Sequence, residues 1–466
     1  MEHDAHGYWL REVGPHEELP VAEGTLDCDV LVVGGGYTGL WTAWRLAEMD
    51  PGASVVVLEA GRCGYGPSGR NGGFANEMWF SLPTLRDRYG DEGALEIARA
   101  AQRSVEEIGR FCHEQEVDAW FRQAGYLQLS AAPAQDGVWD EAVSLCAELG
   151  VPEAARELTP EHVAGICRSP RFRGGAFYPG AATVHPARLA IGLRDRVAAL
   201  PSVRVFEHSP VRRLRAGAWG AVAETPSATV RAGACVLGVG GAANAGGSPF
   251  RRCLTVTSSH MAITEPVPDL LEAVGWTGGE CITDSRAMIH YLRTTPDGRI
   301  AFGWGGGRIA YGARLGGATE VDPTVVPQVL ADLRAFFPGL EGRRIDHAWG
   351  GPIDVSPTHL PVVAQAGSDR VFSAFGYTGN GVGPANMVGG ILASLALDRR
   401  NELSRLALVE PSPSRVPGGL PGYVGGNAIR WGLLAKEAAE EEEGIASAIH
   451  RGLARIPELV GVHIGR

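Results

Sequence analysis

The spacing of apolar residues changes twice within the first 60 positions of the chain. Residues 28–33 form a short apolar run rich in β-branched side chains, which predicts a buried strand. Across residues 40–47 the apolar positions recur at helical spacing, while Arg45 and Glu48 fall on another face. A second β-branched run at 54–58 predicts the next strand. The pattern therefore predicts a strand–helix–strand unit at the start of the chain.

Glycines occupy the turn between the first strand and the helix. Gly34, Gly36 and Gly39 have the spacing GxGxxG, and Glu59 follows 20 residues after the last of them (59 − 39 = 20). In a dinucleotide fold such glycines allow a tight turn, close approach of a pyrophosphate and close packing of helix on strand. The helix start attracts the phosphates, and a carboxylate at this distance binds the ribose hydroxyls. A chain with 65 glycines matches the short motif easily, but the complete ordered unit favours dinucleotide binding over an unliganded βαβ unit.

Composition narrows the class of protein. The chain has 466 residues, of which 45% are apolar and 20% charged, as in a globular protein with about two to three domains' worth of core. Its net charge of −11 argues against nucleic-acid binding. The eight cysteines form no CxxC pair, which predicts reduced thiols and no metal site. The first residues do not resemble a signal peptide and no apolar run approaches a membrane span, so we expect a cytoplasmic protein without membrane contact.

A second glycine-rich segment, residues 60–73, follows directly after Glu59 and contains Arg62 and Arg70. Such a loop can bring backbone amides and a cation to an anionic ligand. With this loop included, residues 34–73 resemble the D-amino-acid oxidase, glycine oxidase and sarcosine oxidase superfamily of FAD enzymes (the DAO family). The run 68–73 looks most like the branch of γ-glutamylputrescine oxidases and aminophosphonate oxidoreductases, and the resemblance covers about residues 8–430.

The resemblance implies a fold that combines α/β and α+β parts. A Rossmann-like FAD-binding domain of the GR2 flavoprotein type would be joined to a mixed-sheet substrate domain. The expected division is a lead-in at 1–24, an FAD-binding domain at 25–80, 171–248 and 345–410, a substrate domain at 81–170 and 249–344, and a linker with a helical tail at 411–466.

Two later segments match glycine motifs of the same family. A buried run ending in Gly240 and Gly241 matches the second motif, although a plain strand and loop is the alternative. Residues 376–383 open a long apolar helix, and in the family this helix start points at the pyrimidine edge of the flavin and stabilises its negative charge. A purely structural helix cap is the alternative there. The FAD-binding residues implied are Gly34, Gly36, Tyr37, Thr38, Gly39, Glu59, Ala60, Arg62, Ser68, Gly69, Arg70, Asn71, Gly72, Gly73, Val211, Gly240, Gly241, Gly351, Gly376, Gly379, Asn380, Gly381 and Val382.

Candidate catalytic side chains are fewer. Sarcosine oxidases place a lysine near flavin N5, but the one lysine of this chain is Lys436, far from any motif. Arg308 is the best candidate for a cation in that neighbourhood, and a solvated surface arginine is the equal alternative. Tyr291 and Tyr377 adjoin matched motifs and are the other candidates.

The chain departs from sarcosine oxidases in two further ways. Gly383 stands near the place of the lysine that clamps the substrate carboxylate in those enzymes, which puts a simple N-methylglycine substrate in doubt. Those enzymes also tether FAD through a cysteine late in the chain, but no cysteine follows Cys281. The expected FAD is therefore bound non-covalently.

The resemblance implies an enzyme that oxidises a CH–NH bond of a small-molecule amine or amino acid. The substrate carbon would lose a hydride to flavin N5, the imine would hydrolyse, and oxygen is the default acceptor, giving hydrogen peroxide. Two alternatives stay open: an amine dehydrogenase that passes electrons to a quinone or a protein carrier, and a non-catalytic FAD-binding subunit of a larger complex.

The composition shifts after residue 410. Residues 411–427 are rich in proline and glycine and are typical of a linker, whereas 435–443 and 445–456 have helical patterns. A tail folded on its own subunit is the simplest interpretation. An oligomer contact or a membrane surface is the alternative, although the acidic flank argues against anionic lipid.

Overall fold

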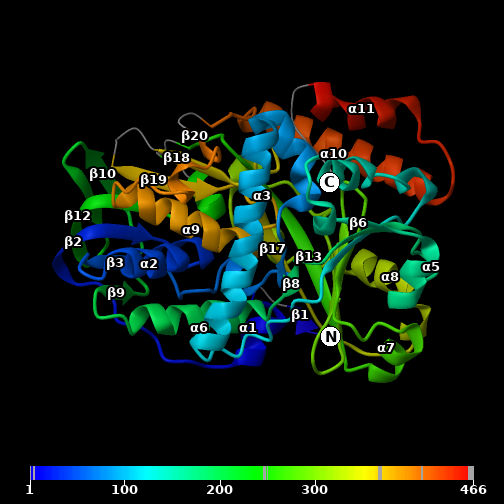
Figure 1. The fold of residues 1–466 in the computed structure, drawn as a ribbon, viewed down its shortest axis with the longest axis horizontal. Helices are drawn as coiled ribbons and strands as arrows, with labels where there is room; N and C mark the ends of the chain where they lie inside the picture. The colour runs from blue at the N-terminus through cyan, green and yellow to red at the C-terminus, as the bar shows by residue number, and fades with distance from the viewer. Residues whose placement is uncertain are drawn as a thin grey trace.

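The computed structural model describes residues 2–3, 6–244, 248, 250–365, 370–410 and 413–459. These residues form two nine-stranded sheets and a two-stranded sheet, β4 (Phe74–Ala75) with β8 (Ala182–Thr183). The first large sheet lies on the left of Figure 1, and the second extends from the centre to the right.

The first sheet contains the predicted strand–helix–strand unit. Its central strands are parallel and run in the order β19–β12–β2–β3–β9, and the four residues of β3 are all buried, as parallel sheets covered on both faces require. The strands of this sheet are β2 (Gly24–Val33), β3 (Val55–Leu58), β9 (Val203–Phe206), β10 (Arg213–Gly217), β11 (Gly220–Glu224), β12 (Ala228–Leu237), β18 (Val362–Gln365), β19 (Val371–Phe375) and β20 (Val409–Glu410).

Helices cover this sheet and pack closely on one another. The long apolar helix α9 packs against α2, where Gly389 faces Trp41 so tightly that a Cβ would lie 2.8 Å from the Trp41 Cβ atom. The helices of this half of the molecule are α1 (Gly7–Val13), α2 (Tyr37–Met49), α3 (Leu82–Glu114), α6 (Pro186–Ala198) and α9 (Val382–Ala396).

The second sheet is mixed and runs in the order β1–β17–β13–β16–β15–β14–β5–β7–β6. Its strands are β1 (Glu2–His3), β5 (Tyr126–Leu129), β6 (Arg156–Leu158), β7 (Gly175–Tyr178), β13 (Thr255–Thr264), β14 (Cys281–Asp284), β15 (His290–Thr294), β16 (Ile300–Trp304) and β17 (Ile345–Val355). The accompanying helices are α4 (Asp140–Glu148), α5 (Pro160–Ile166), α7 (Pro268–Val274) and α8 (Val326–Phe336).

The sheets do not follow the expected domain ranges at every point. β7 and β17 belong to the second sheet, although 171–248 and 345–410 are the ranges expected for the FAD-binding domain. The alternation of a strand predicts that it is half buried, but not which sheet it joins, because pairing is decided by distant partners. Residues 1, 4–5, 245–247, 249, 366–369, 411–412 and 460–466 of the expected ranges lie outside the described part.

The C-terminal segment forms two packed helices, α10 (Gly419–Glu441) and α11 (Ala448–Leu459), drawn in orange and red in Figure 1. The linker prediction is wrong for 419–427, because α10 begins at Gly419. Gly426 lies against Ile309, so tertiary packing outweighs the low helix propensity of these glycines. Among the described residues, none of the helices is long and apolar enough to cross a membrane.

Candidate functional site

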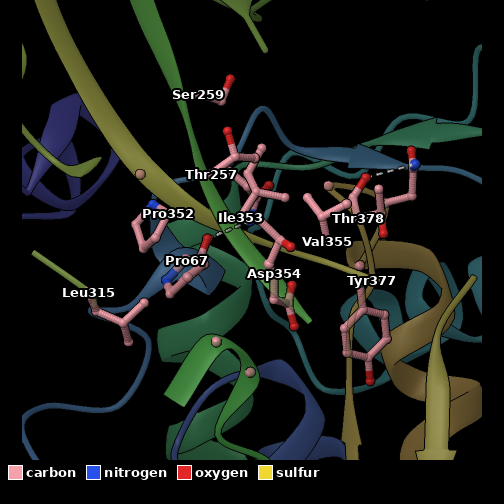
Figure 2. A pocket seen from close by; sticks show the side chains of 18 of the residues that line it. Pro67, Thr257, Ser259, Leu315, Pro352, Ile353, Asp354, Val355, Tyr377 and Thr378 are labelled. Carbon is pink, nitrogen blue, oxygen red and sulfur yellow. Dashed lines mark hydrogen bonds between the residues drawn. The ribbon is translucent and has the colours of Figure 1, made fainter. Parts of the chain in front are cut away.

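A large cavity lies between the two sheets and encloses about 1360 Å³. Its walls come from the α2 turn, the loop after β3, β13, β17, the segment before α9 and the C-terminal helices. Figure 2 shows Thr257 of β13 beside Ile353 of β17, with Tyr377 next to Asp354 and Val355 of the same strand β17. This volume exceeds the roughly 300–1,000 Å³ of a typical small-ligand pocket, so it can hold a dinucleotide together with a smaller molecule.

One end of the cavity is built around Glu59. The Gly35 amide donates to Glu59 Oε2 at 2.7 Å, and the Gly61 amide donates to Oε1 at 2.8 Å. Ala60, Arg62 and Val211 line the cavity beside this carboxylate. The two backbone amides hold the carboxylate at the end of β3, where it can accept hydrogen bonds from a ribose.

The glycines of the α2 turn show which positions tolerate no side chain. A Cβ on Gly39 would lie 1.9 Å from the Gly34 carbonyl oxygen, and one on Gly34 would lie 2.4 Å from the Gly238 carbonyl oxygen. Gly36 differs, since the nearest atom to its Cβ is the flexible Ser68 hydroxyl at 2.9 Å, and it lines the cavity. Gly34 and Gly39 therefore serve packing, while Gly36 leaves space at the positive end of α2.

The loop 66–73 turns back against this helix end. The Ser68 hydroxyl accepts from the Tyr37 amide at 2.9 Å, and the Asn71 side chain donates to the Ser68 carbonyl at 2.8 Å and accepts from the Gly73 amide at 2.7 Å. Arg70 is buried, and its guanidinium lies 3.0 Å from Glu320. The loop is therefore fixed by its own hydrogen bonds and keeps Arg70 and Asn71 at the cavity wall.

The start of α9 closes another side of the cavity. The Tyr377 hydroxyl lies 2.8 Å from the Thr38 hydroxyl, and the Gly376 amide donates to Asp354 Oδ2 at 2.6 Å. Burial raises the pKa of Asp354 to about 6, and it also raises the pKa of Tyr377. Residues 379–382 line the cavity directly before and at the helix start, which brings positive helix-end charge to this side.

The side of the cavity formed by the second sheet carries a hydroxyl pair. Tyr291 Oη lies 2.7 Å from Ser259 Oγ, which donates to the Trp304 carbonyl at 2.9 Å. Burial raises the pKa of Tyr291 to about 12, so its phenol keeps its proton at neutral pH. Because Ser259 donates to Trp304, the Tyr291 phenol donates to Ser259, and the pair can accept a hydrogen bond from a small molecule in the cavity.

Arg308 lies apart from the other catalytic candidates. It does not line the cavity, its side chain is 54% exposed, and it pairs with Asp322 while donating to Thr324. The solvated-arginine alternative therefore describes its surroundings better than a role at the reacting atoms.

Most of the predicted binding residues meet at this one cavity. Gly39, Gly69, Gly73 and Gly376 do not line it but shape the turns beside it. The lining set is Gly34, Gly36, Tyr37, Thr38, Glu59, Ala60, Arg62, Ser68, Arg70, Asn71, Gly72, Val211, Gly240, Gly241, Tyr291, Gly351, Tyr377, Gly379, Asn380, Gly381 and Val382.

Ser259, Asp354 and several residues of the C-terminal helices also line the cavity, although no sequence motif predicted them. Asp354 could have been found, because it is a carboxyl group three residues after Gly351, one of the FAD-binding residues that the resemblance implies. Ser259 and the α10 residues Ile429, Arg430 and Leu433 carry no local motif, and only the tertiary structure brings them to the cavity.

The arrangement fits FAD. A carboxylate held at the end of β3, open space at the N-terminus of α2 and a second helix start beside it match what adenosine, pyrophosphate and flavin need. The fold and site thus define a dinucleotide-binding flavoprotein.

Comparison with known proteins identifies the family. Residues 29–395 match the DAO family, described as FAD dependent oxidoreductase. This chain therefore belongs to the DAO family of FAD-dependent oxidoreductases.

Similar sequences and structures agree with this assignment. The chain is 27% identical to a probable oxidoreductase OrdL of Rhizobium meliloti (92% of this chain, 95% of the other). It is 29% identical to gamma-glutamylputrescine oxidoreductase of Escherichia coli (85% and 89%). Its fold is similar to that of glycine oxidase from Geobacillus kaustophilus, with a TM-score of 0.66 at 20% identity (84% and 100%). It also resembles the fold of L-proline dehydrogenase from P. horikoshii, with a TM-score of 0.66 at 19% identity (82% and 96%).

Proposed function

We propose that this flavoenzyme oxidises a CH–NH bond of an amine or amino acid to an imine, which then hydrolyses in water. One observation carries the proposal: a single cavity joins the dinucleotide cradle at Glu59 to the Tyr291–Ser259 pair on the second sheet. The names of its relatives, which include a gamma-glutamylputrescine oxidoreductase and a glycine oxidase, support this substrate class.

The bound FAD would supply the acceptor for the hydride that leaves the substrate carbon. The residues of this chain would bind the FAD and the substrate and orient them. The amides at 379–381 and the start of α9 stabilise negative charge at the flavin side of the cavity, while Tyr291 and Ser259 offer hydroxyls to the substrate. Oxidation by hydride transfer needs a neutral amine aimed at the acceptor, so the proposal assigns no general base.

Oxygen as final acceptor, with hydrogen peroxide as product, is part of the proposal. A dehydrogenase that uses a quinone or protein carrier is the second candidate, supported by the lack of any lysine besides Lys436, which lies on α10. We also propose non-covalent FAD, because the described residues that line the cavity include no cysteine, and a cytoplasmic location.

Anaerobic bleaching of the flavin absorption tests the function. The panel contains polyamines, γ-glutamyl amines, aminophosphonates, D-amino acids and N-methyl amino acids. Bleaching by one class, with rapid recovery in air, is the expected result, and slow recovery in air favours the dehydrogenase. Bleaching by dithionite but by no amine would overturn the CH–NH assignment and favour the non-catalytic subunit.

A further inference from the structure

The C-terminal helix α10 forms part of the cavity wall, although it lies beyond residue 395, where the family match ends. Three of its residues, Ile429, Arg430 and Leu433, line the cavity. In Figure 1 α10 and α11 lie over the half of the molecule that contains the second sheet. This part of the site is therefore supplied by a segment that the family as a whole does not define.

Buried ion pairs and hydrogen bonds hold α10 in place. Glu437 Oε1 accepts from the Ala287 amide at 2.7 Å and from the Met288 amide at 3.1 Å. Arg286 lies 2.9 Å from Asp284 and also pairs with Glu441. Ala287 and Met288 themselves line the cavity, so α10 is fixed to the loop that forms the neighbouring wall.

Arg430 contacts only neutral groups in this wall. Its Nε donates to the Gly307 carbonyl at 2.7 Å and the Gly306 carbonyl at 3.0 Å, and its Nη2 also donates to Gly306. Within the described ranges, no carboxylate lies within salt-bridge distance of Arg430. A guanidinium has five N–H donors, so both donors of Nη1 and one of Nη2 stay available beyond these bonds.

Two other arginines of this region, unlike Arg430, have a carboxylate partner within the described part of the chain. Arg70 pairs with Glu320, and Arg308 pairs with Asp322. Partial burial and the charge of Arg308 lower the pKa of Arg430, while the charge of Asp322 raises it; Asp322 itself forms its ion pair with Arg308. A carboxylate or a phosphonate can accept two parallel hydrogen bonds from a guanidinium edge and would give Arg430 an anionic hydrogen-bond partner.

We propose that Arg430 binds an oxyanion, a carboxylate or a phosphonate, on the substrate and so selects anionic amines over neutral ones. The site lies close to the hydroxyl pair of the second sheet, because Ser259 donates to the Trp304 carbonyl only two residues before Gly306. The inference rests on the proposed function, since it places an amine substrate in the same cavity. Arg430 thus acts as a specificity-determining residue supplied by the tail.

The test compares anaerobic flavin reduction by matched amines in the FAD-loaded full chain. Each pair differs by one anionic group: glycine against methylamine, γ-aminobutyrate against propylamine, and aminomethylphosphonate against methylamine. The variants are Arg430→Gln and Arg430→Lys, and the matched control is Lys436→Gln. Lys436 lies on the same helix, pairs with Glu440 and does not line the cavity.

Arg430→Gln is expected to weaken the apparent binding of the anionic amines about 10- to 100-fold and leave neutral amines unchanged. Arg430→Lys is expected to restore part of the loss, and Lys436→Gln to change nothing. The carboxylate and phosphonate arms show which oxyanion the site prefers. Equal losses for anionic and neutral amines would show that Arg430 only anchors α10, and no loss for either would also overturn the proposal.

The failure of this inference can be told apart from failure of the proposed function. If neutral amines reduce the flavin and Arg430→Gln does not change the binding of anionic amines relative to neutral ones, the proposed amine oxidation is supported and the oxyanion site is contradicted. If no amine reduces the flavin, perturbation of its visible spectrum by glutarate and methylphosphonate still tests the site. Loss of that perturbation in Arg430→Gln, but not in Lys436→Gln, supports it, and an unchanged perturbation contradicts it.

Discussion

The hydroxyl oxygens of Tyr377 and Thr38 lie 2.8 Å apart, although 339 positions separate the two residues in the chain. Thr38 lies in the first turn of α2, and Tyr377 lies just before α9, so this bond joins the two helix starts that face the cavity. Both side chains are buried. The positive ends of α2 and α9 are thus held in a fixed relation.

Removing either hydroxyl of this pair is expected to lower the free energy of unfolding by a similar amount. Tyr377→Phe should lower the free energy of unfolding by about 1 kcal/mol, because it leaves the buried Thr38 hydroxyl without its partner. Thr38→Val should cost a similar amount, and the double variant less than the sum. Urea unfolding of the four proteins measures the coupling, and strictly additive losses would show that the bond contributes nothing.

The two glycines of the α2 turn are expected to respond differently to alanine. Gly39→Ala should lower the free energy of unfolding by at least about 2 kcal/mol, because its Cβ would lie 1.9 Å from a backbone oxygen. Gly36→Ala should fold, since the Ser68 side chain can move, but should bind FAD more weakly. Circular dichroism and FAD content separate the two effects. A well-folded Gly39→Ala protein would contradict this account of the turn.

The Glu59 carboxylate is expected to strengthen the binding of FAD. Glu59→Ala removes the carboxylate that accepts from the Gly35 and Gly61 amides and that we propose binds the ribose. Loss of hydrogen bonds to a charged group should weaken FAD binding about 10- to 100-fold. Titration of the apoprotein with FAD, followed by flavin fluorescence, gives the dissociation constant. Glu23→Gln, at an exposed position, is the control, and an unchanged affinity in Glu59→Ala would exclude the ribose role.

The stability of the α10 contact is expected to depend on pH through Glu437. Burial raises the pKa of this carboxyl to about 7, above its ordinary value near 4.5. Between these values the folded protein binds more protons than the unfolded chain, so the free energy of unfolding falls as pH rises from about 4.5 to about 7.

Glu437→Gln removes this titration and keeps an oxygen that can accept from the Ala287 and Met288 amides. The melting temperature of the wild type relative to this variant should therefore decrease as pH rises through that window. Melting curves at several pH values measure the difference. The exposed Glu442→Gln is the control, and parallel curves for wild type and Glu437→Gln would contradict the prediction.

The parts of the site that depend on local chemistry could be predicted from the sequence. A strand, a glycine turn, a helix and a carboxylate in fixed order define the α2 turn, and Glu59 and Gly39 act on residues of the same βαβ unit. The same holds for the helix start at 376–383, where glycine, proline and an apolar run mark the beginning of α9.

Only the tertiary structure shows which residues form the cavity wall near the second sheet, where we propose that the substrate binds. Arg308 and Arg430 both lie near the Gly306 and Gly307 carbonyls, but Asp322 neutralises Arg308, and α10 brings Arg430 to the cavity wall. Likewise β7 and β17 joined the second sheet, and 419–427 became helical through contacts with distant residues. Sequence patterns report local conformation and burial, whereas the partner of a charge or a strand is set by long-range packing, which no local pattern encodes.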